Sequence, residues 1–348
     1  MKGITTYGAV ATKIRGMRSH LLTTEDYEKI AACPSVREIV MFLKGHPSYG
    51  EVLEELDPDN MRRESFERMI LRSVFRDFAK IAHFLDRQHK DLLTVFSVEY
   101  ELRLLNNLIR NIYNRYSEQS DLSVYRPMYE GSPNFDFDRV IKAKDMDSMI
   151  NALEGSPYQA PLLKIRKMAD KPTLFDYETA ITRFHFSYYF DALKKIDDHA
   201  ERDVLLEIRG SQIDMLNIVW IYRSKAYYKM TAKEITDFII PACHKLKPAQ
   251  IARMAAAPNA EEVLNIVAET RYAKSFDLTD PESMEEAVNA HIEKLNAKTR
   301  RDYPYSFAVI GAYAYDKKAE VDRIVRITES VRYGYDPKVI LDALHIQR

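Results

Sequence analysis

Two glycines in the segment LKGHPSYGEVL, residues 43–53, stand at a spacing that could bind phosphate. Gly45 and Gly50 are separated by four residues, as in the P-loop pattern G-x-x-x-x-G-K-[ST]. A P-loop needs a lysine that reaches the phosphates and a hydroxyl that holds Mg²⁺, but Glu51 and Val52 follow Gly50. Because a carboxylate repels a phosphate, the sequence argues against a P-loop here and favours a corner in the fold.

Residues that carry out catalysis or bind metals are not grouped at the spacings that such chemistry needs. His83 and His89 are six residues apart, so on a helix they lie on different faces, unlike the i, i+4 pair of a zinc helix. His185 lies in an aromatic stretch, which is typical of a core or boundary histidine. Cys33 and Cys243 are the 2 cysteines, too few for a disulfide framework. The sequence therefore predicts no catalytic residue, no metal site and no cofactor.

Polar side chains inside strongly apolar stretches are better candidates for function. They are Asn106, Asn107 and Arg110; Asp214, Asn217 and Arg223; and Glu320, Arg323 and Arg326. Since buried polar groups must be paired, one interpretation is that they hydrogen-bond between helices and fix the packing. The other is that some line a cavity and bind a partner. The residues chosen for that role are Arg110, Asn217, Arg223 and Arg326.

A row of basic residues follows one face of a predicted helix. Its members are Arg63, Arg68, Arg72, Arg76, Lys80 and Arg87. One interpretation is a solvated face, and the other is a docking face for an acidic partner. Interspersed acidic residues, such as Glu67 and Asp77, make nucleic acid a less favoured partner.

The elements that must position these residues are predicted to be helices. Glycine, which supplies the positive φ angles of tight hairpins, accounts for only 10 of 348 residues. Apolar residues recur at every third or fourth position and strand-like alternation is almost absent, so we predict an all-α fold. The long helices are predicted at residues 61–90, 99–116, 174–195, 207–228, 281–300 and 307–332, with breaks near Asp91, at Asp197-Asp198 and at Tyr303-Pro304.

Shorter segments between the long helices carry a threefold repeat. They read REIVMFLKGHPSY (37–49), DSMINALEGSPY (147–158) and EEVLNIVAETRY (261–272), with the final tyrosines 109 and 114 residues apart. We predict corners at which glycine ends a helix, proline prevents its resumption and tyrosine packs the next segment. The corner residues are Gly45, Pro47, Tyr49, Gly155, Pro157, Tyr158 and Tyr272.

A period above 100 residues is too long for a solenoid and indicates three similar helical bundles. We predict repeat units at residues 1–90, 91–199 and 200–300, followed by closing helices at 301–348. The net charge is -1, so no charge excess marks a nucleic-acid or membrane-surface binder. No apolar run reaches the ~18 residues of a membrane span, and MKGITTYGAV lacks the apolar core of a signal peptide. We therefore expect a cytoplasmic protein.

Three segments, taken in order with the repeat, resemble a known family. They are YGAVATKIRGM followed by LLTTEDYEKI, then IDMLNIVWIYRSKAYYKMTAKEITDFIIPACHKL, and finally AEVDRIVRITESVRYGYDPKVILDAL. Over essentially its full length the chain resembles the C subunit of V/A-type ATPases, which is related to the d subunit of eukaryotic V-ATPases. Two residues depart from the family pattern: Arg323 replaces the usual Asn, and Cys243 stands where glycine is common.

The resemblance implies a funnel-shaped, all-helical protein with three similar bundles around a pseudo-threefold axis. It implies a rotor component of the central stalk, without an active site, that couples a shaft of the D and F subunits to the membrane rotor ring. Such a protein binds no nucleic acid, does not itself span the membrane and is held at the membrane by the complex. The alternatives are a helical scaffold for other partners and a helical enzyme of the terpenoid synthase kind. That enzyme needs an acidic D-D-x-x-D motif, which Asp197-Asp198-His199-Ala200-Glu201 imitates poorly.

Overall fold

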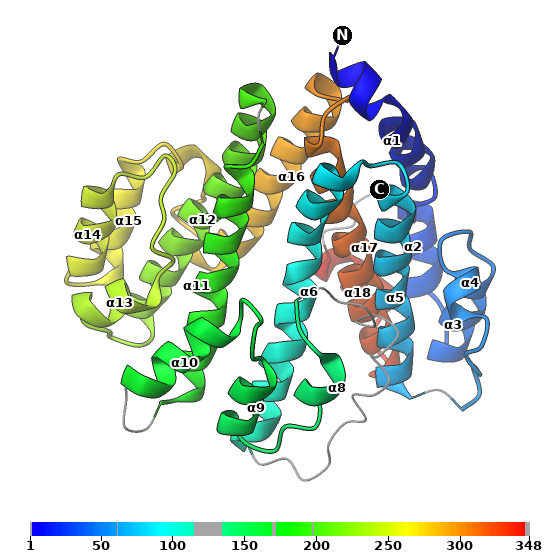
Figure 1. Ribbon diagram of the computed structural model, residues 1–348, viewed down its shortest axis with the longest axis horizontal. Helices are drawn as coiled ribbons and strands as arrows, with labels where there is room; N and C mark the ends of the chain where they lie inside the picture. Colours follow the sequence, from blue (N-terminus) through cyan, green and yellow to red (C-terminus); the bar gives the residue numbers. More distant parts are fainter. Residues whose placement is uncertain (1, 61, 115–133, 169–171, 197, 345–348) are drawn as a thin grey trace. The chain divides into compact units, whose positions relative to one another are not determined.

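The described part of the chain consists of helices joined by turns and loops (Figure 1). The structure, a computed structural model, describes residues 2–60, 62–114, 134–168, 172–196 and 198–344. These ranges contain no strand, so the predicted all-α class is confirmed. The arrangement of three bundles around a pseudo-threefold axis stays a prediction. Among the described helices, none combines the length and the apolar character needed to cross a membrane.

The chain divides into two compact units, of which the first combines both ends of the sequence. Unit 1 comprises residues 1–97, 116–143 and 305–348. Its helices are α1 (Lys2–Arg18), α2 (Thr24–Ala31), α3 (Val36–Lys44), α4 (Gly50–Leu53), α5 (Arg63–Ala82), the first part of α6 (Arg87–Asn114), α8 (Phe137–Val140), α17 (Ala308–Arg332) and α18 (Pro337–Ala343). The long helix α17 contacts α1, α2, α3, α5 and α18, so the end of the chain completes the core of its beginning.

Unit 2 comprises residues 98–115 and 144–304. Its helices are the rest of α6, α9 (Met146–Ala152), α10 (Gln159–Met168), α11 (Leu174–Leu193), α12 (His199–Ala226), α13 (Ala232–Phe238), α14 (Pro248–Ala256), α15 (Ala260–Ala268), the short 3₁₀ turns η2 (Ala273–Ser275) and η3 (Pro281–Ser283), and α16 (Met284–Asp302). The central helix α12 contacts α11, α14, α15 and α16 (Figure 1).

Local sequence explains where several helices begin. In a capping box, a side chain before the helix accepts the backbone N–H three residues on, and that residue's side chain accepts an N–H in return. The pairs are Thr23–Asp26 at α2, Asp145–Ser148 at α9, Thr173–Asp176 at α11 and Thr231–Glu234 at α13. Asp198 caps α12 in a simpler way, by accepting the backbone N–H of Glu201.

The starts of two predicted helices differ from the structure. Helix α6 begins at Arg87 rather than near Asp91, and the predicted end at Tyr116 lies outside the described residues. Helix α12 begins at His199, eight residues before the predicted start, because the Asp198 cap precedes a first turn too charged to show the apolar period. Within the acidic motif Asp198 serves as the cap of α12, and Asp197 lies outside the described residues.

Candidate functional site

The first corner is fastened to α17 by a buried group of three polar side chains. The hydroxyl of Tyr49 donates a hydrogen bond to Glu320 Oε1 over 2.5 Å. The ammonium of Lys317 donates to Glu320 Oε1 at 2.8 Å and to the Tyr49 hydroxyl oxygen at 2.9 Å. The backbone N–H of Leu22, just before α2, donates to Glu320 Oε2. One carboxylate therefore ties together α17, the turn before α2 and the corner after α3.

Burial makes this group energetically important. The side chains of Lys317 and Glu320 are 1% and 2% exposed, and they lie three residues apart on one face of α17. Removing two charges from water is costly, and the attraction of the pair offsets that cost only when further hydrogen bonds satisfy the ions. Burial, and then the adjacent Glu320 carboxylate, raises the pKa of Tyr49 well above its usual value, so its hydroxyl stays protonated as a donor.

The same contact recurs twice in unit 2, and we call each instance a tyrosine–carboxylate joint. Tyr272 donates its hydroxyl to Asp214 Oδ2 of α12 at 2.9 Å. Tyr158 donates its hydroxyl to Glu101 of α6. All three tyrosines and all three carboxylates are buried. Each corner tyrosine is therefore fixed to a long helix by a buried hydrogen bond as well as by the packing of its ring.

Asp214 accepts hydrogen bonds from the backbone as well as from its tyrosine. In addition to the Tyr272 hydroxyl, it accepts the backbone N–H groups of His244, Lys245 and Leu246, at 2.9, 2.6 and 2.9 Å. These N–H groups precede α14, just as Leu22 precedes α2. Joints one and three therefore have the same design, in which a carboxylate holds both the entry of a corner and its tyrosine.

Sequence reasoning found two of these carboxylates and missed the third. Asp214 and Glu320 stand out as polar residues in apolar helices, but Glu101 was not singled out. The spacing of the repeat could have identified Glu101, because it precedes Tyr158 by 57 residues and Asp214 precedes Tyr272 by 58. No comparable pattern marks Lys317, which reads as one more lysine in a mixed segment.

The two glycines of the P-loop-like spacing serve the corner in ways that differ from the prediction. Gly45 ends α3 as its C-cap, but its φ of −77° is right-handed, so the left-handed conformation expected of a terminating glycine is absent. Gly155, its counterpart in the second corner, does have a positive φ of 79°. Gly50 is the sterically constrained residue, because a Cβ there would lie 2.7 Å from the carbonyl oxygen of Lys44. Pro47 and Pro157 both lie in the turns that follow the two helices.

Replacing these glycines should separate the two roles. We expect Gly50→Ala to lower the free energy of unfolding by about 1–3 kcal/mol, because the new methyl group overlaps a backbone carbonyl that cannot move freely. Gly45→Ala serves as the control and should change it by less than about 1 kcal/mol, since the Cβ meets only an ordinary contact at 3.4 Å. Urea denaturation followed by circular dichroism measures both. Equal losses for the two variants would contradict the steric assignment.

The structure places the four residues selected for partner binding in different environments. Asn217 is fully buried, and its amide binds backbone: Nδ2 donates to the carbonyl of Ile240 at 3.0 Å, and Oδ1 accepts the N–H of the same residue at 3.0 Å. It therefore has the packing role that the sequence left open. Arg110 and Arg223 are on the surface of unit 2, where they form ion pairs with Glu178 and Glu285. Arg326 is exposed on α17 of unit 1.

The basic row on α5 is not a single solvated face. Arg63 forms an ion pair with Glu67 at 2.6 Å, as expected for an exposed helix surface. Arg76 instead points inward: Nη2 donates to the backbone carbonyl of Ser48 at 2.6 Å, and its side chain is only 15% exposed. Lys80, one turn further along α5, lines the same pocket as Arg76.

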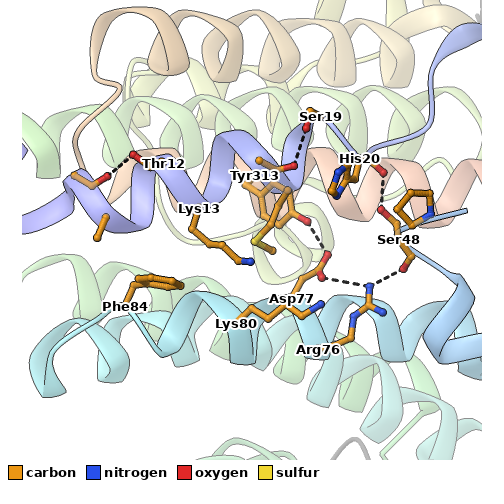
Figure 2. Close-up of a pocket in the computed structure, with 15 residues that line it drawn as sticks. Thr12, Lys13, Ser19, His20, Ser48, Arg76, Asp77, Lys80, Phe84 and Tyr313 are labelled. Atoms are coloured by element: carbon orange, nitrogen blue, oxygen red, sulfur yellow. Dashed lines mark hydrogen bonds and ion pairs between the residues drawn. The ribbon is translucent and has the colours of Figure 1, made fainter.

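This pocket lies within unit 1 and has a volume of about 910 Å³ (Figure 2). Residues of α1, α5, α17 and the turn at Pro47-Ser48 line it. At its wall Asp77 accepts the Tyr313 hydroxyl at 2.6 Å and pairs with Arg76 at 3.6 Å. Burial, followed by the Asp77 carboxylate, raises the pKa of Tyr313 above its usual range. No group of three or more metal-binding side chains occurs within the described residues, here or elsewhere.

Comparison with known proteins shows which family this helical chain matches. The family described as ATP synthase (C/AC39) subunit matches residues 10–343. The chain belongs to this family. The resemblance drawn from the sequence motifs is thereby confirmed. The joints and the pocket described above lie almost entirely within the range that the C/AC39 family covers.

Archaeal members of the C/AC39 family cover nearly all of the chain. The C subunit of the A-type ATP synthase of Pyrococcus abyssi is 24% identical over 348 residues, which cover 97% of this chain and 89% of the relative. The protein of the same name from Archaeoglobus fulgidus is 23% identical, with 93% and 92% covered. That of Methanosarcina barkeri is 22% identical, with 98% and 93% covered. The similarity is therefore distant but continuous along both chains.

Proposed function

We propose that the chain is a non-catalytic central-stalk subunit of a V/A-type rotary ATPase. In this role it couples a shaft of the D and F subunits to the membrane rotor ring, during ATP-driven ion transport or ATP synthesis. The family match, and relatives that are named as C subunits of A-type ATP synthases, support membership of such a complex. The chain would be held at the membrane by the ring, without a span of its own. The threefold layout of units 1–90, 91–199 and 200–300, closed by 301–348, belongs to this proposal.

The observation that carries the coupling role is the threefold occurrence of the tyrosine–carboxylate joint. A subunit that transmits torque must not yield internally, and each joint fixes a corner to a long helix through buried hydrogen bonds. The helices are long enough to transmit force across the protein: α12 has 28 residues, or about 42 Å at the usual rise. Glycine, which would soften such helices, is rare in the chain.

Exposed tyrosines at the ends of the joint-bearing helices support a role in binding partners. Tyr227 and Tyr228 follow α12, and Tyr333 and Tyr335 follow α17, with exposed fractions of 59%, 73%, 72% and 57%. Tyr113, near the end of α6, is 41% exposed. Since tyrosine and arginine are enriched where proteins bind one another, we propose these ends as contact points for the shaft or the ring.

A binding experiment tests the proposal directly. The purified chain should co-elute with the D–F shaft complex, and separately with the detergent-solubilised rotor ring. Binding to neither would refute the coupling role and leave the alternative of a helical scaffold with other partners. Binding to only one would place the chain in the complex but remove its function as the link.

Charge reversal at the surface arginines tests their part in shaft binding. We expect Arg110→Glu and Arg223→Glu each to weaken shaft binding about tenfold or more, because charge pairs across interfaces commonly contribute that much. The helical circular-dichroism signal should survive, since the ion pairs with Glu178 and Glu285 are at the surface. Surface plasmon resonance with immobilised shaft complex measures the affinity.

A charge swap provides the matched control for Arg223. In the double variant Arg223→Glu/Glu285→Arg the internal ion pair is rebuilt with its signs exchanged. If Arg223 contacts the shaft, the swap should not restore affinity. Full recovery would show that the arginine acts only through Glu285, and would assign it a purely structural role.

A further inference from the structure

Two lysines without ion partners face the pocket of unit 1 from opposite walls. Lys13 extends from α1 and Lys80 from α5 (Figure 2). Within the described ranges neither ammonium forms an ion pair or a hydrogen bond with another residue. Partly buried lysines usually find a carboxylate, so two free ones around one cavity leave positive charge that a ligand can neutralise.

Arg76 adds a third positive charge and an unused donor. Its two Nη atoms are engaged, one by the Ser48 carbonyl and one by Glu51 at 3.1 Å. Its Nε–H is buried and finds no acceptor among the described residues. Asp77 is the single acidic residue of the lining, and its charge is already bound by Tyr313 and Arg76. The lining therefore has more cationic donors than acceptors.

The wall formed by α1 leaves space for a ligand. Gly8, Ala9, Thr12 and Gly16 present small side chains, or none, to the pocket. A Cβ placed on Gly16 would meet nothing within 4 Å, so helix packing does not demand glycine there. Glycine inside a helix costs about 0.5–1 kcal/mol relative to alanine. Open space over Gly16 is consistent with a site that has to admit another molecule.

We propose that this pocket binds a small phosphate-bearing molecule, with its phosphoryl oxygens between Lys13 and Lys80. This site is separate from the coupling role and does not depend on it. A phosphoryl group carries up to two negative charges and three acceptor oxygens, which matches two ammonium groups better than a single carboxylate does. The volume is within the range of small-molecule sites, and Phe84, 40% exposed at the rim, offers an apolar surface to the rest of the molecule.

Titration calorimetry on the full-length chain, without the other subunits, tests the site. The probes are inorganic phosphate, pyrophosphate and ATP, all at low ionic strength. We expect saturable binding of pyrophosphate and ATP, with ATP displacing pyrophosphate. ATP that binds more tightly than pyrophosphate would assign the site to a nucleotide, whereas equal affinities would assign it to the phosphate groups alone. No saturable binding of any probe would overturn the proposal.

Paired variants show whether binding occurs in this pocket. The double variant Lys13→Gln/Lys80→Gln should weaken pyrophosphate binding at least tenfold, because charge-assisted hydrogen bonds are lost. The double variant Lys90→Gln/Lys338→Gln removes the same charge from exposed positions of unit 1 and should leave affinity unchanged. An equal loss of pyrophosphate affinity in both double variants would show that binding depends only on the overall positive charge, and would refute the site.

A steric variant tests the location without altering charge. Gly16→Phe places a ring in the open space over α1 and should weaken pyrophosphate binding about tenfold, while the circular-dichroism spectrum and shaft binding stay unchanged. Unchanged pyrophosphate affinity would show that the anion binds outside this pocket. Failure of the chain to bind the shaft would bear on the coupling role only, so the two proposals can fail independently.

Discussion

Glu320→Gln is expected to lower the free energy of unfolding by about 3–5 kcal/mol, which is a large part of a domain's total stability. The substitution keeps the shape of the side chain but removes its charge, so the ammonium of Lys317, only 1% exposed, loses its counter-ion. Tyr49 donates to Oε1 and Leu22 to Oε2, and glutamine replaces one of these two oxygens by an NH₂ group, so one of the two donors also loses its acceptor. Urea denaturation followed by circular dichroism measures the loss.

A double-mutant cycle identifies the source of that loss. Lys317→Met alone leaves Glu320 without its cation, whereas Lys317→Met/Glu320→Gln leaves no charge in the joint. We expect the double variant to lose at least about 2 kcal/mol less than the sum of the single variants, because each single change leaves one unpaired charge. The exposed pair Arg253–Glu269 provides the control: Glu269→Gln should leave the free energy of unfolding almost unchanged, because water screens a surface ion pair. If the effects of the two substitutions simply add, the buried ion pair is not the cause of the stability lost in Glu320→Gln.

The helices could be predicted from the sequence because their information is local. Apolar residues at every third or fourth position give α11 and α17 to within about two residues of the predicted limits: they are Leu174–Leu193 and Ala308–Arg332. The predicted start of a helix was wrong where a capping residue, and not the apolar pattern, sets it, as Asp198 does before α12. The left-handed conformation expected of Gly45 in the first corner was wrong for a related reason. A sequence repeat shows which positions correspond, but it does not show which φ angle each of them adopts.

The joints were only half predictable because their partners are remote in the chain. Tyr49 and Glu320 are 271 residues apart, and nothing local links a corner near the start to a helix near the end. The repeat identified the tyrosines, and the apolar context identified Asp214 and Glu320 as unusual. Whether such residues pack or bind partners depends on burial, which is a property of the tertiary structure. The pocket could not be predicted from the sequence for the same reason, since only folding brings Lys13 of α1 close to the basic residues of α5.

Corresponding joints also differ at one position, and the difference clarifies a departure from the family pattern. Three residues after Asp214 stands Asn217, which binds the backbone of Ile240. Three residues after Glu320 stands Arg323, where the sequence resemblance leads us to expect Asn. Its guanidinium lies 5.8 Å from the centre of the Tyr27 ring on α2, a cation–π contact. The same place in two repeats is thus filled by an amide that binds backbone and by a cation that packs on a ring.

Asp214→Asn should lower the free energy of unfolding by about 4 kcal/mol. The buried carboxylate accepts four hydrogen bonds, three of them from the backbone N–H groups of residues 244–246. Asparagine has one carbonyl oxygen. At the Oδ2 position this oxygen keeps three of the bonds without the charge that strengthens them, while the NH₂ group replaces Oδ1 and faces the N–H of His244. The lost bond and the three weakened bonds together give the expected cost, since a bond to a charged acceptor contributes roughly 1.5–3 kcal/mol and a neutral one about 1 kcal/mol. The backbone before α14 should loosen first, which amide hydrogen exchange at residues 244–246 would record.

Tyr272→Phe is the matched control, because it removes one donor and leaves the carboxylate and the three backbone bonds intact. Its expected cost is about 1–2 kcal/mol, with exchange at residues 244–246 unchanged. Since joint three has no buried lysine in contact with its carboxylate within the described residues, the loss in Asp214→Asn comes from hydrogen bonds and not from a stranded charge. A loss for Tyr272→Phe as large as that for Asp214→Asn would assign the stability of the joint to the tyrosine, and would remove the carboxylate from its centre.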